Sequence, residues 1–405
     1  MGIIDNTQNI KTGKFYGPSY NAVQLNLQKP TLNTVSPPVI YDYPQFDGQM
    51  YYPPMPVNPL NFGQKSEITR TPSGIEGYDN YSETDINGEE VVSVKYSKEG
   101  DKIVQNLKTK SPDGTTIEKI LKNSSNFKSS NIVIKDINGN TLLSKEKIYS
   151  KQNEDSAQTI VNGSVYNVSG LKGNVITVEH NGESVCIDLD KMLDSEVKLL
   201  KMRTSPNNLP IRDTKITDEE KQKLYNRIKS LGGDELFRLS KSVEHLQFLD
   251  EKSIESFFVE NGKTLLLSSK DYLNSNMVTK HELGHAVNHS AYGREDRSLS
   301  DYESFKMIRN YEKMNFKQNT NMTDGDKLFG SKFMFSNPDL EWTDNNEFDE
   351  DLEQNLRDET FAECYNNLNS MDIINYDNEV LPMRTLSLFR YLPKTMVETE
   401  ILSQI

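Results

Sequence analysis

The sequence predicts an α+β fold in which strands come first along the chain and helices follow. Asn-Gly and Asp-Gly pairs recur between residues 87 and 182 among β-branched residues, which is typical of successive β-hairpins. Beyond about residue 205, apolar residues take up helical spacing. Ahead of both, prolines are too frequent for a long helix or a central strand. We therefore expect an irregular N-terminal arm (1–68), an antiparallel β-meander domain (69–200) and a mainly helical C-terminal domain (205–405).

The composition excludes several classes of function. The chain has 405 residues, with 46 Lys and Arg against 60 Asp and Glu, and a net charge of −14. Because contacts to phosphates need basic patches, we expect no nucleic-acid partner and no general binding to anionic membranes. No apolar run approaches the roughly 18 residues that a membrane span needs, and the N-terminus lacks the pattern of a signal peptide. Cys186 and Cys364 are far apart, so we expect buried thiols rather than a disulfide or a cysteine zinc site.

Residues 1–68 have the Pro- and Tyr-rich pattern of an extended arm. Two Pro-Pro pairs, at 37–38 and 53–54, favour an extended backbone. Two interpretations stay open. The arm is a free leader or export tag, or it makes an intramolecular contact with the C-terminal domain.

The meander is predicted from its turns. Asn-Gly or Asp-Gly pairs start at positions 87, 113, 138, 162 and 181, each between strand-like segments. Such pairs tolerate the positive φ angles of a type I′ turn, so we expect two-residue hairpin loops. The segments DINGEE (85–90) and DINGNT (136–141) indicate a weak internal repeat. Since His180 is the single histidine here, a binding or spacer role is favoured over chemistry.

Helical signals begin with a capping box at residues 217–220, where Thr and Glu side chains satisfy first-turn amides. Apolar residues from Leu236 to Leu246 keep helical spacing. Residues 256–269 form two strand-like runs around an Asn-Gly pair, which predicts a hairpin. A helix is expected over 275–292, with Gly293 as its C-cap.

The helix expected over 275–292 contains the pattern H-E-x-x-H, formed by His281, Glu282 and His285. Histidines at i and i+4 lie on one helical face, so both imidazoles can bind one tetrahedral Zn²⁺ at roughly 2.0–2.1 Å. Glu282 lies beside the metal and can act as the general base for a zinc-bound water. His289 continues the series, but it lies about 12 Å along the axis from His281. We therefore expect His289 to support the site or lie on the surface.

The third ligand must come from downstream. Glu359 and Glu363 are four residues apart, so one carboxylate can bind the metal while the other orients a ligand histidine. A solvated acidic helix is the alternative interpretation of this segment. Glu303 is the competing ligand, at a spacing close to that of thermolysin-like and aminopeptidase-like enzymes.

HELGHAV (281–287) followed by ETFAE (359–363) resembles the anthrax lethal factor-type metallopeptidases, which include the secreted Pro-Pro endopeptidases of spore-forming bacteria. The resemblance covers at most 205–405 and implies a zincin-like catalytic domain there. It implies that Glu359 is the zinc ligand, Glu363 its second-shell partner and Glu282 the base. The family carries a Tyr that stabilises the oxyanion at the position of Leu352 here. Three tyrosines are candidates to replace it: Tyr292, Tyr302 and Tyr311.

These observations predict a zinc metalloendopeptidase that acts on a protein or peptide substrate. His281, His285 and Glu359 hold the Zn²⁺ cofactor, and Glu282 moves the proton. An edge strand within the 256–269 hairpin is expected to pair with an extended substrate through Thr264, Leu265, Leu266 and Leu267. The acidic run 344–353 indicates tolerance of basic residues near the scissile bond.

The alternative is a catalytically degenerate zincin that acts as a binding or structural protein through its β domain and N-terminal arm. Leu352 is the best support for this alternative. For localisation, the resemblance implies action outside the producing cell, and the N-terminus without a signal peptide implies a leaderless export route or a cytoplasmic protein. We expect an exported, toxin-like effector.

Overall fold

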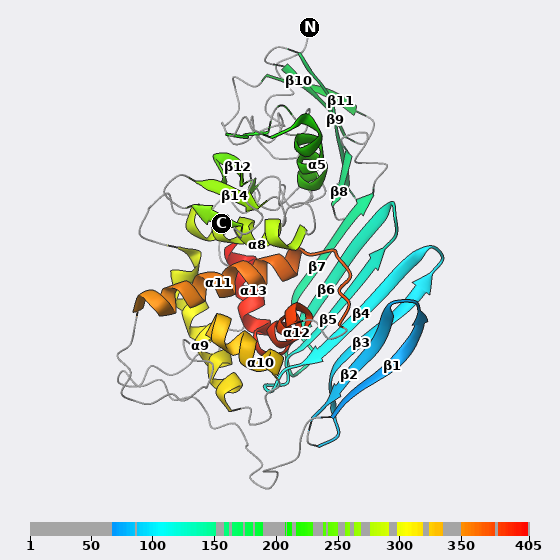
Figure 1. Ribbon diagram of the computed structural model, residues 1–405, viewed down its shortest axis with the longest axis vertical. Coiled ribbons are helices and arrows are strands. Elements are labelled where there is room, and N and C mark those ends of the chain that lie inside the picture. The colour runs from blue at the N-terminus through cyan, green and yellow to red at the C-terminus, as the bar shows by residue number, and fades with distance from the viewer. Residues whose placement is uncertain are drawn as a thin grey trace.

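The computed structural model describes most of the chain from residue 67 onward. The described residues are 67–85, 87–150, 158–161, 164–172, 175–180, 183–188, 207, 209–212, 216–229, 238–239, 242–249, 256–259, 263–268, 276–290, 298–318, 324–334, 350–376 and 380–403. Strands come first and most helices follow, as Figure 1 shows. The predicted α+β class is confirmed. The calls that fall on residues 1–66 lie outside the described residues.

A seven-stranded antiparallel sheet forms the N-terminal part, in the order β1-β2-β3-β4-β5-β6-β7. Every strand pairs with its sequence neighbour, so the predicted meander is confirmed up to residue 150. Its strands are β1 (Glu67–Ile75), β2 (Tyr78–Thr84), β3 (Glu90–Glu99), β4 (Lys102–Lys110), β5 (Thr116–Asn123), β6 (Phe127–Lys135) and β7 (Thr141–Ser150).

Three predicted turns lie where the sequence places them, but their type differs from the prediction. Gly88, Gly114 and Gly139 have φ angles of 79°, 84° and 84°, whereas the residue before each glycine has a negative φ. In the third, Gly139 N–H donates to Asp136 O at 3.0 Å and Asp136 N–H to Asn140 O at 2.9 Å. The left-handed residue is the glycine at the end of this turn and not the asparagine before it, so the turn is not of type I′.

The aspartate of the repeated DING segment explains why these loops are well defined. Asp85 Oδ1 accepts from the backbone N–H groups of Asn87 and Glu89 at 2.8 and 2.9 Å. Asp136 Oδ1 accepts from Asn138 and Asn140 at 2.9 and 2.8 Å. The side chain thus satisfies amides that the tight loop leaves without a backbone partner.

A second antiparallel sheet follows, in the order β11-β10-β9-β8. It contains β8 (Gln158–Val161), β9 (Ser164–Lys172), β10 (Val175–His180) and β11 (Glu183–Asp188). The Asn-Gly pairs at 162 and 181 lie between these strands but outside the described residues.

One face of the seven-stranded sheet packs against helices from the C-terminal region (Figure 1). The shared core joins Val94, Ile117 and Ile132 of the sheet to aromatic residues such as Phe316 and Phe389. The helices concerned are α9 (Glu303–Lys317), α10 (Asp324–Phe329), α12 (Val380–Tyr391) and α13 (Pro393–Leu402). Neither the sheet nor these helices can bury their apolar faces without the other.

Buried ionic contacts cross the same boundary. Lys145 of β7 pairs with Glu400 of α13, and both side chains are less than a tenth exposed. Arg390 of α12 donates to Glu83 of β2 at 2.9 Å. Because each charge needs its partner once it is buried, these pairs fix how the helices sit on the sheet.

Two predictions between residues 216 and 249 had different outcomes. The capping box is confirmed: Glu220 N–H donates to Thr217 Oγ1 at 3.2 Å, and Thr217 N–H to Glu220 Oε2 at 2.9 Å, at the start of α5 (Asp218–Lys229). The helical spacing up to Leu246 was wrong at its end, because Leu246 lies in strand β12 (His245–Leu249).

The predicted hairpin over 256–269 is confirmed as β13 (Phe257–Val259) and β14 (Thr264–Ser268). The expected substrate-pairing edge at Thr264, Leu265, Leu266 and Leu267 was wrong. The sheet order is β12-β14-β13, so β14 is the central strand and bonds to β12 in parallel and to β13 in antiparallel. Leu265 and Leu267 are also fully buried. Within the described residues the outer strands beside β14 are β12 and β13, and Leu246 of β12 also bridges to Ile211.

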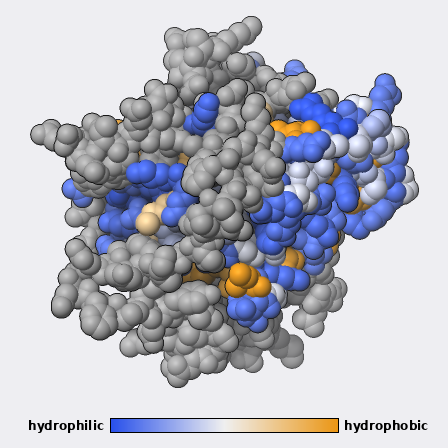
Figure 2. Space-filling model, turned by 90° about the horizontal axis from the view of Figure 1, so that it is seen from below, coloured by the Kyte–Doolittle hydropathy of each residue, from blue (hydrophilic) through white to orange (hydrophobic). Residues whose placement is uncertain are grey.

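The described surface is mainly polar. Figure 2 shows this for the face seen from below, where apolar residues form small separate areas. Exposed large apolar side chains among the described residues are scattered: Ile68, Ile137, Met314, Leu352 and Ile401. Among these residues, no helix combines the length and apolar character that crossing a membrane requires.

Candidate metal centre

The site is built from two helices that touch backbone to backbone. α8 (Asn276–Ser290) carries the H-E-x-x-H pattern, and α11 (Glu350–Asn369) carries the downstream glutamates. They meet at Gly284, where a Cβ would lie 2.8 Å from Ala362 Cα and 3.0 Å from Ala362 O. Only glycine permits this approach, which brings the histidines of one helix to the carboxylates of the other.

His281, His285 and Glu359 converge as the sequence predicts. One nitrogen or oxygen from each lies within 4.8 Å of the others. The two Nε2 atoms are 3.2 Å apart, and each lies 3.4 Å from an oxygen of Glu359. A tetrahedral zinc site with bonds of about 2.1 Å has ligand-to-ligand distances of about 3.4 Å. His281 faces Oε2 of Glu359 and His285 faces Oε1, so the three side chains are close enough to share one metal ion.

The charges of the site favour a cation. Burial lowers the pKa of the His281 imidazole, but hydrogen bonds to Glu359 and Glu363 outweigh it and raise the pKa to about 10. Burial raises the pKa of the Glu359 carboxyl, yet hydrogen bonds to His281 and His285 hold it well below its usual range. Glu359 therefore stays ionised over the physiological range, and its charge attracts a positive ion to the two imidazoles.

Glu363 lies behind His281, as predicted for the second carboxylate. Its Oε2 is 3.0 Å from His281 Nδ1. Glu363 is 4 % exposed. Burial raises the pKa of its carboxyl, but the hydrogen bond from His281 and the other lowering effects outweigh burial, so the net pKa is lowered. A carboxylate on Nδ1 fixes the tautomer in which Nδ1 carries the proton and Nε2 offers its lone pair to a metal.

Glu282 follows the first histidine and is 6 % exposed. It is not part of the three-residue donor group, which agrees with a position beside the metal rather than on it. Its charge contributes to the raised pKa of His281, so it lies within electrostatic reach of the site.

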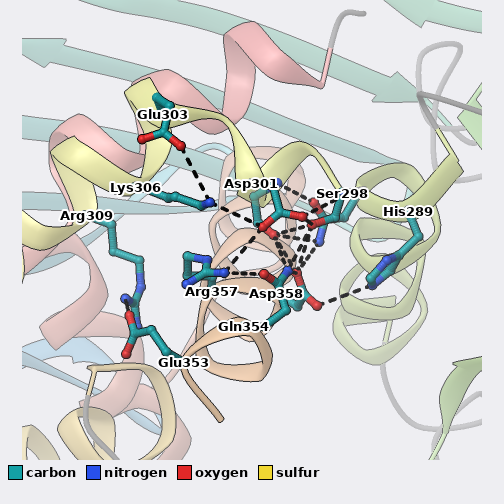
Figure 3. A network of polar contacts seen from close by, with 12 residues as sticks. His289, Ser298, Asp301, Glu303, Lys306, Arg309, Glu353, Gln354, Arg357 and Asp358 are labelled. Carbon is teal, nitrogen blue, oxygen red and sulfur yellow. Dashed lines mark hydrogen bonds and ion pairs between the residues drawn. The ribbon is translucent and has the colours of Figure 1, made fainter. Parts of the chain in front are cut away.

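Glu303, the competing ligand, lies elsewhere. Its side chain is 93 % exposed and its carboxylate faces Lys306 at 3.7 Å (Figure 3). Glu303 is the first residue of α9, its side chain lies in water, and it is not part of the group that could hold a metal. The candidacy of Glu303 as the third ligand was therefore wrong.

The positions of Leu352 and of the three candidate tyrosines do not single out one residue as the oxyanion donor. Leu352 is exposed on α11. The ammonium group of Lys394 lies over the ring of Tyr311, 4.9 Å from the ring centroid. Tyr302 precedes α9, and Tyr292 lies outside the described residues. The choice among these tyrosines stays a prediction.

A buried polar network beside the ligands was not predicted from the sequence. Asp358 Oδ1 accepts from Asn288 and Gln354 at 2.8 and 2.9 Å, and from the hydroxyl of Ser300. His289 Nε2 lies 3.6 Å from Asp358 Oδ2, as Figure 3 shows. The network ties α8, α11 and the turn η4 (Leu299–Asp301) together next to Glu359. His289 thus lies against this network, and its role as a second-shell or surface residue stays a prediction.

The sequence offered one local indication that Asp358 belongs to the site, namely its position directly before Glu359 in an acidic segment. The alternative interpretation of that segment as a solvated face was wrong from Leu356 to Glu363, since Leu356, Asp358 and Glu363 are buried. Cys364, on the same helix, is a buried free thiol as expected.

The close approach at Gly284 gives a prediction. In a solvent-exposed helix, alanine is more favourable than glycine by about 1 kcal/mol, so Gly284→Ala would be stabilising there. Here we expect a net loss of about 1–3 kcal/mol, because the new methyl overlaps the backbone of α11. Urea unfolding measures the difference. Adding Ala362→Gly should restore nothing, since the nearby atoms are backbone atoms, and restoration by that change would contradict the packing.

Comparisons with known proteins assign no family. No family model matches the chain, and no solved structure matches it. Over 186 residues the chain is 27 % identical to a curated protein of Lodderomyces elongisporus, named DNA-directed RNA polymerase III subunit RPC3. The match covers 42 % of this chain and 29 % of that protein. The chain therefore spans less than a third of this relative.

Proposed function

We propose that the protein is a zinc-dependent metalloendopeptidase. The observation that carries the proposal is the convergence of His281, His285 and Glu359, whose donor atoms lie within 4.8 Å of one another. Glu282 beside this group supplies a carboxylate that can act as a base in zinc-dependent hydrolysis, and Glu363 behind it supplies one that orients a ligand histidine. The resemblance to lethal factor-type metallopeptidases points to the same roles for the same residues.

His281, His285 and Glu359 would hold the ion, and three protein ligands are the number that leaves a catalytic zinc one position for water or substrate. When bound, zinc supplies a Lewis acid that polarises a peptide carbonyl and lowers the pKa of water. Glu282 is the general base that takes the proton of the attacking water and returns it to the leaving amine. Glu363 keeps the proton of His281 on Nδ1, so that Nε2 remains a ligand.

The substrate strand is assigned to β13. An extended peptide can add to a sheet edge through its backbone hydrogen bonds, and β13 is one of the two outer strands in the described part of the three-stranded sheet. Phe258 of β13 stacks on His289 of α8, with ring centroids 6.4 Å apart. The edge is therefore next to the helix that carries the ligand histidines.

Leu352 favours a second candidate, a zincin that binds its partner without cleaving it. A missing oxyanion donor costs about 2.7–4 kcal/mol of transition-state stabilisation. Such a protein would keep its metal and lack activity.

Metal removal tests the proposal. The purified chain with one equivalent of zinc is incubated with a mixture of unstructured peptides, and the products are identified by mass spectrometry. We expect internal cleavage that a chelator abolishes and that added zinc restores. Stoichiometric zinc binding with no cleavage of any peptide would favour the second candidate, and failure to bind zinc would reject both.

A further inference from the structure

The hydrogen bonds behind His281 do not stop at Glu363. The amide Nδ2 of Asn367 donates to Glu363 Oε1 at 3.1 Å and to the backbone Glu363 O at 2.9 Å. Glu363 Oε2 is then the atom that faces His281 Nδ1. Asn367 is fully buried, so water does not compete for the carboxylate oxygen that it contacts.

The seven-stranded sheet holds Asn367 in place from the other side. Lys119 of β5 is 3 % exposed, and its ammonium group donates to the backbone O of Asn367 at 2.7 Å. Burial is the main cause that lowers the pKa of Lys119, to about 7. Asp372 is the charge that favours the ammonium form, and the ammonium group itself donates to the carbonyl of Asn367.

We propose that Asn367 is a positioning residue of the metal centre, which orients the Glu363 carboxylate and through it the imidazole of His281. The inference rests on the proposed function only in taking His281 as a metal ligand. Through Lys119 and Asn367, the N-terminal sheet becomes part of the support of a site that lies entirely on helices.

The physical reason is the freedom of a carboxylate. Glu363 can rotate about its last side-chain bond, and the hydrogen bond from Asn367 to Oε1 opposes a rotation that would take Oε2 away from His281 Nδ1. Without the amide of Asn367, Oε1 would lose the hydrogen bond that this residue donates and would compete for the Nδ1 proton. Partners of this kind change metal affinity by about 10–100-fold in other sites.

Asn369 is a matched control on the same helix. Its Nδ2 donates to Tyr365 O at 2.7 Å, the same i to i−4 contact that Asn367 makes with Glu363 O, and it is also fully buried. Within the described part of the chain, Oδ1 of each asparagine accepts no hydrogen bond. Leucine at either position therefore removes only the Nδ2 contacts, and only Asn367→Leu removes a contact to the carboxylate.

The experiment compares the zinc affinity of the full-length wild type, Asn367→Leu and Asn369→Leu, by competition with a chelating dye. The melting temperature of each chain without zinc is measured alongside. We expect zinc affinity to fall about 10–100-fold for Asn367→Leu and less than threefold for Asn369→Leu, with similar changes in melting temperature. If a leucine variant does not fold, Asn367→Ala and Asn369→Ala give the same comparison.

Two results would overturn the inference. One is equal zinc affinity of the two variants, and the other is a wild type that binds no zinc. Failure of the proposed function has a different signature, because a chain that cleaves no peptide but loses zinc affinity only at Asn367 supports the inference and rejects the protease.

Discussion

Glu282→Ala is expected to lower kcat/KM for peptide cleavage by about 10²–10⁴-fold, the usual contribution of a general acid–base group. The structure motivates this value, because Glu282 is buried beside the three residues that could hold a metal without belonging to them. Its removal should leave zinc binding in place, which separates loss of the base from loss of the metal. Activity is followed with a peptide that the wild type cleaves, and zinc content is measured on the same sample.

Glu303→Ala is the matched control for this experiment. It removes the same side chain from a position that is 93 % exposed and paired only loosely with Lys306. We expect wild-type kinetics from it. A Glu282→Ala variant that cleaves as fast as Glu303→Ala would remove Glu282 from the mechanism and, with it, the proposed reaction.

Signals that depend on neighbouring residues were read correctly from the sequence. The capping box at Thr217 and Glu220 involves residues three apart, and both of its bonds are present. The turns at Gly88, Gly114 and Gly139 lie where predicted, because a left-handed glycine marks the reversal of the chain whichever turn type forms. Their type was missed, since it depends on the aspartate or serine two residues before the pair as well.

Signals that depend on distant partners were not available in the sequence. β14 became a central strand because β12 pairs with it in parallel, and β12 begins near Leu246, whose spacing had indicated a helix. A continuous apolar run such as that of β14 is typical of a strand buried on both faces. The run shows that the strand is buried, but it does not name β12 as the partner that makes the strand central.

The candidate site divides in the same way. H-E-x-x-H is a local pattern, and it placed His281, Glu282 and His285 on one helix without tertiary information. Glu359 and Glu363 were found by their spacing, which the resemblance supported. The network of Asp358 and the contact of Lys119 with Asn367 join residues far apart in the chain, and no spacing predicts them.

The Glu359→Gln variant is expected to lose at least about 100-fold in zinc affinity, because it replaces a charged ligand with a neutral amide. Glu363→Gln removes the charge behind His281 and should lose about 10–100-fold. Glu303→Gln should bind zinc like the wild type, since its side chain lies in solvent away from α8. Competition with a chelating dye ranks the three variants on one scale. If Glu363→Gln bound zinc more weakly than Glu359→Gln, Glu363 would be the ligand and Glu359 the orienting partner. Because Glu363 contacts Nδ1 of His281 rather than Nε2, that result would also require the imidazole ring to turn.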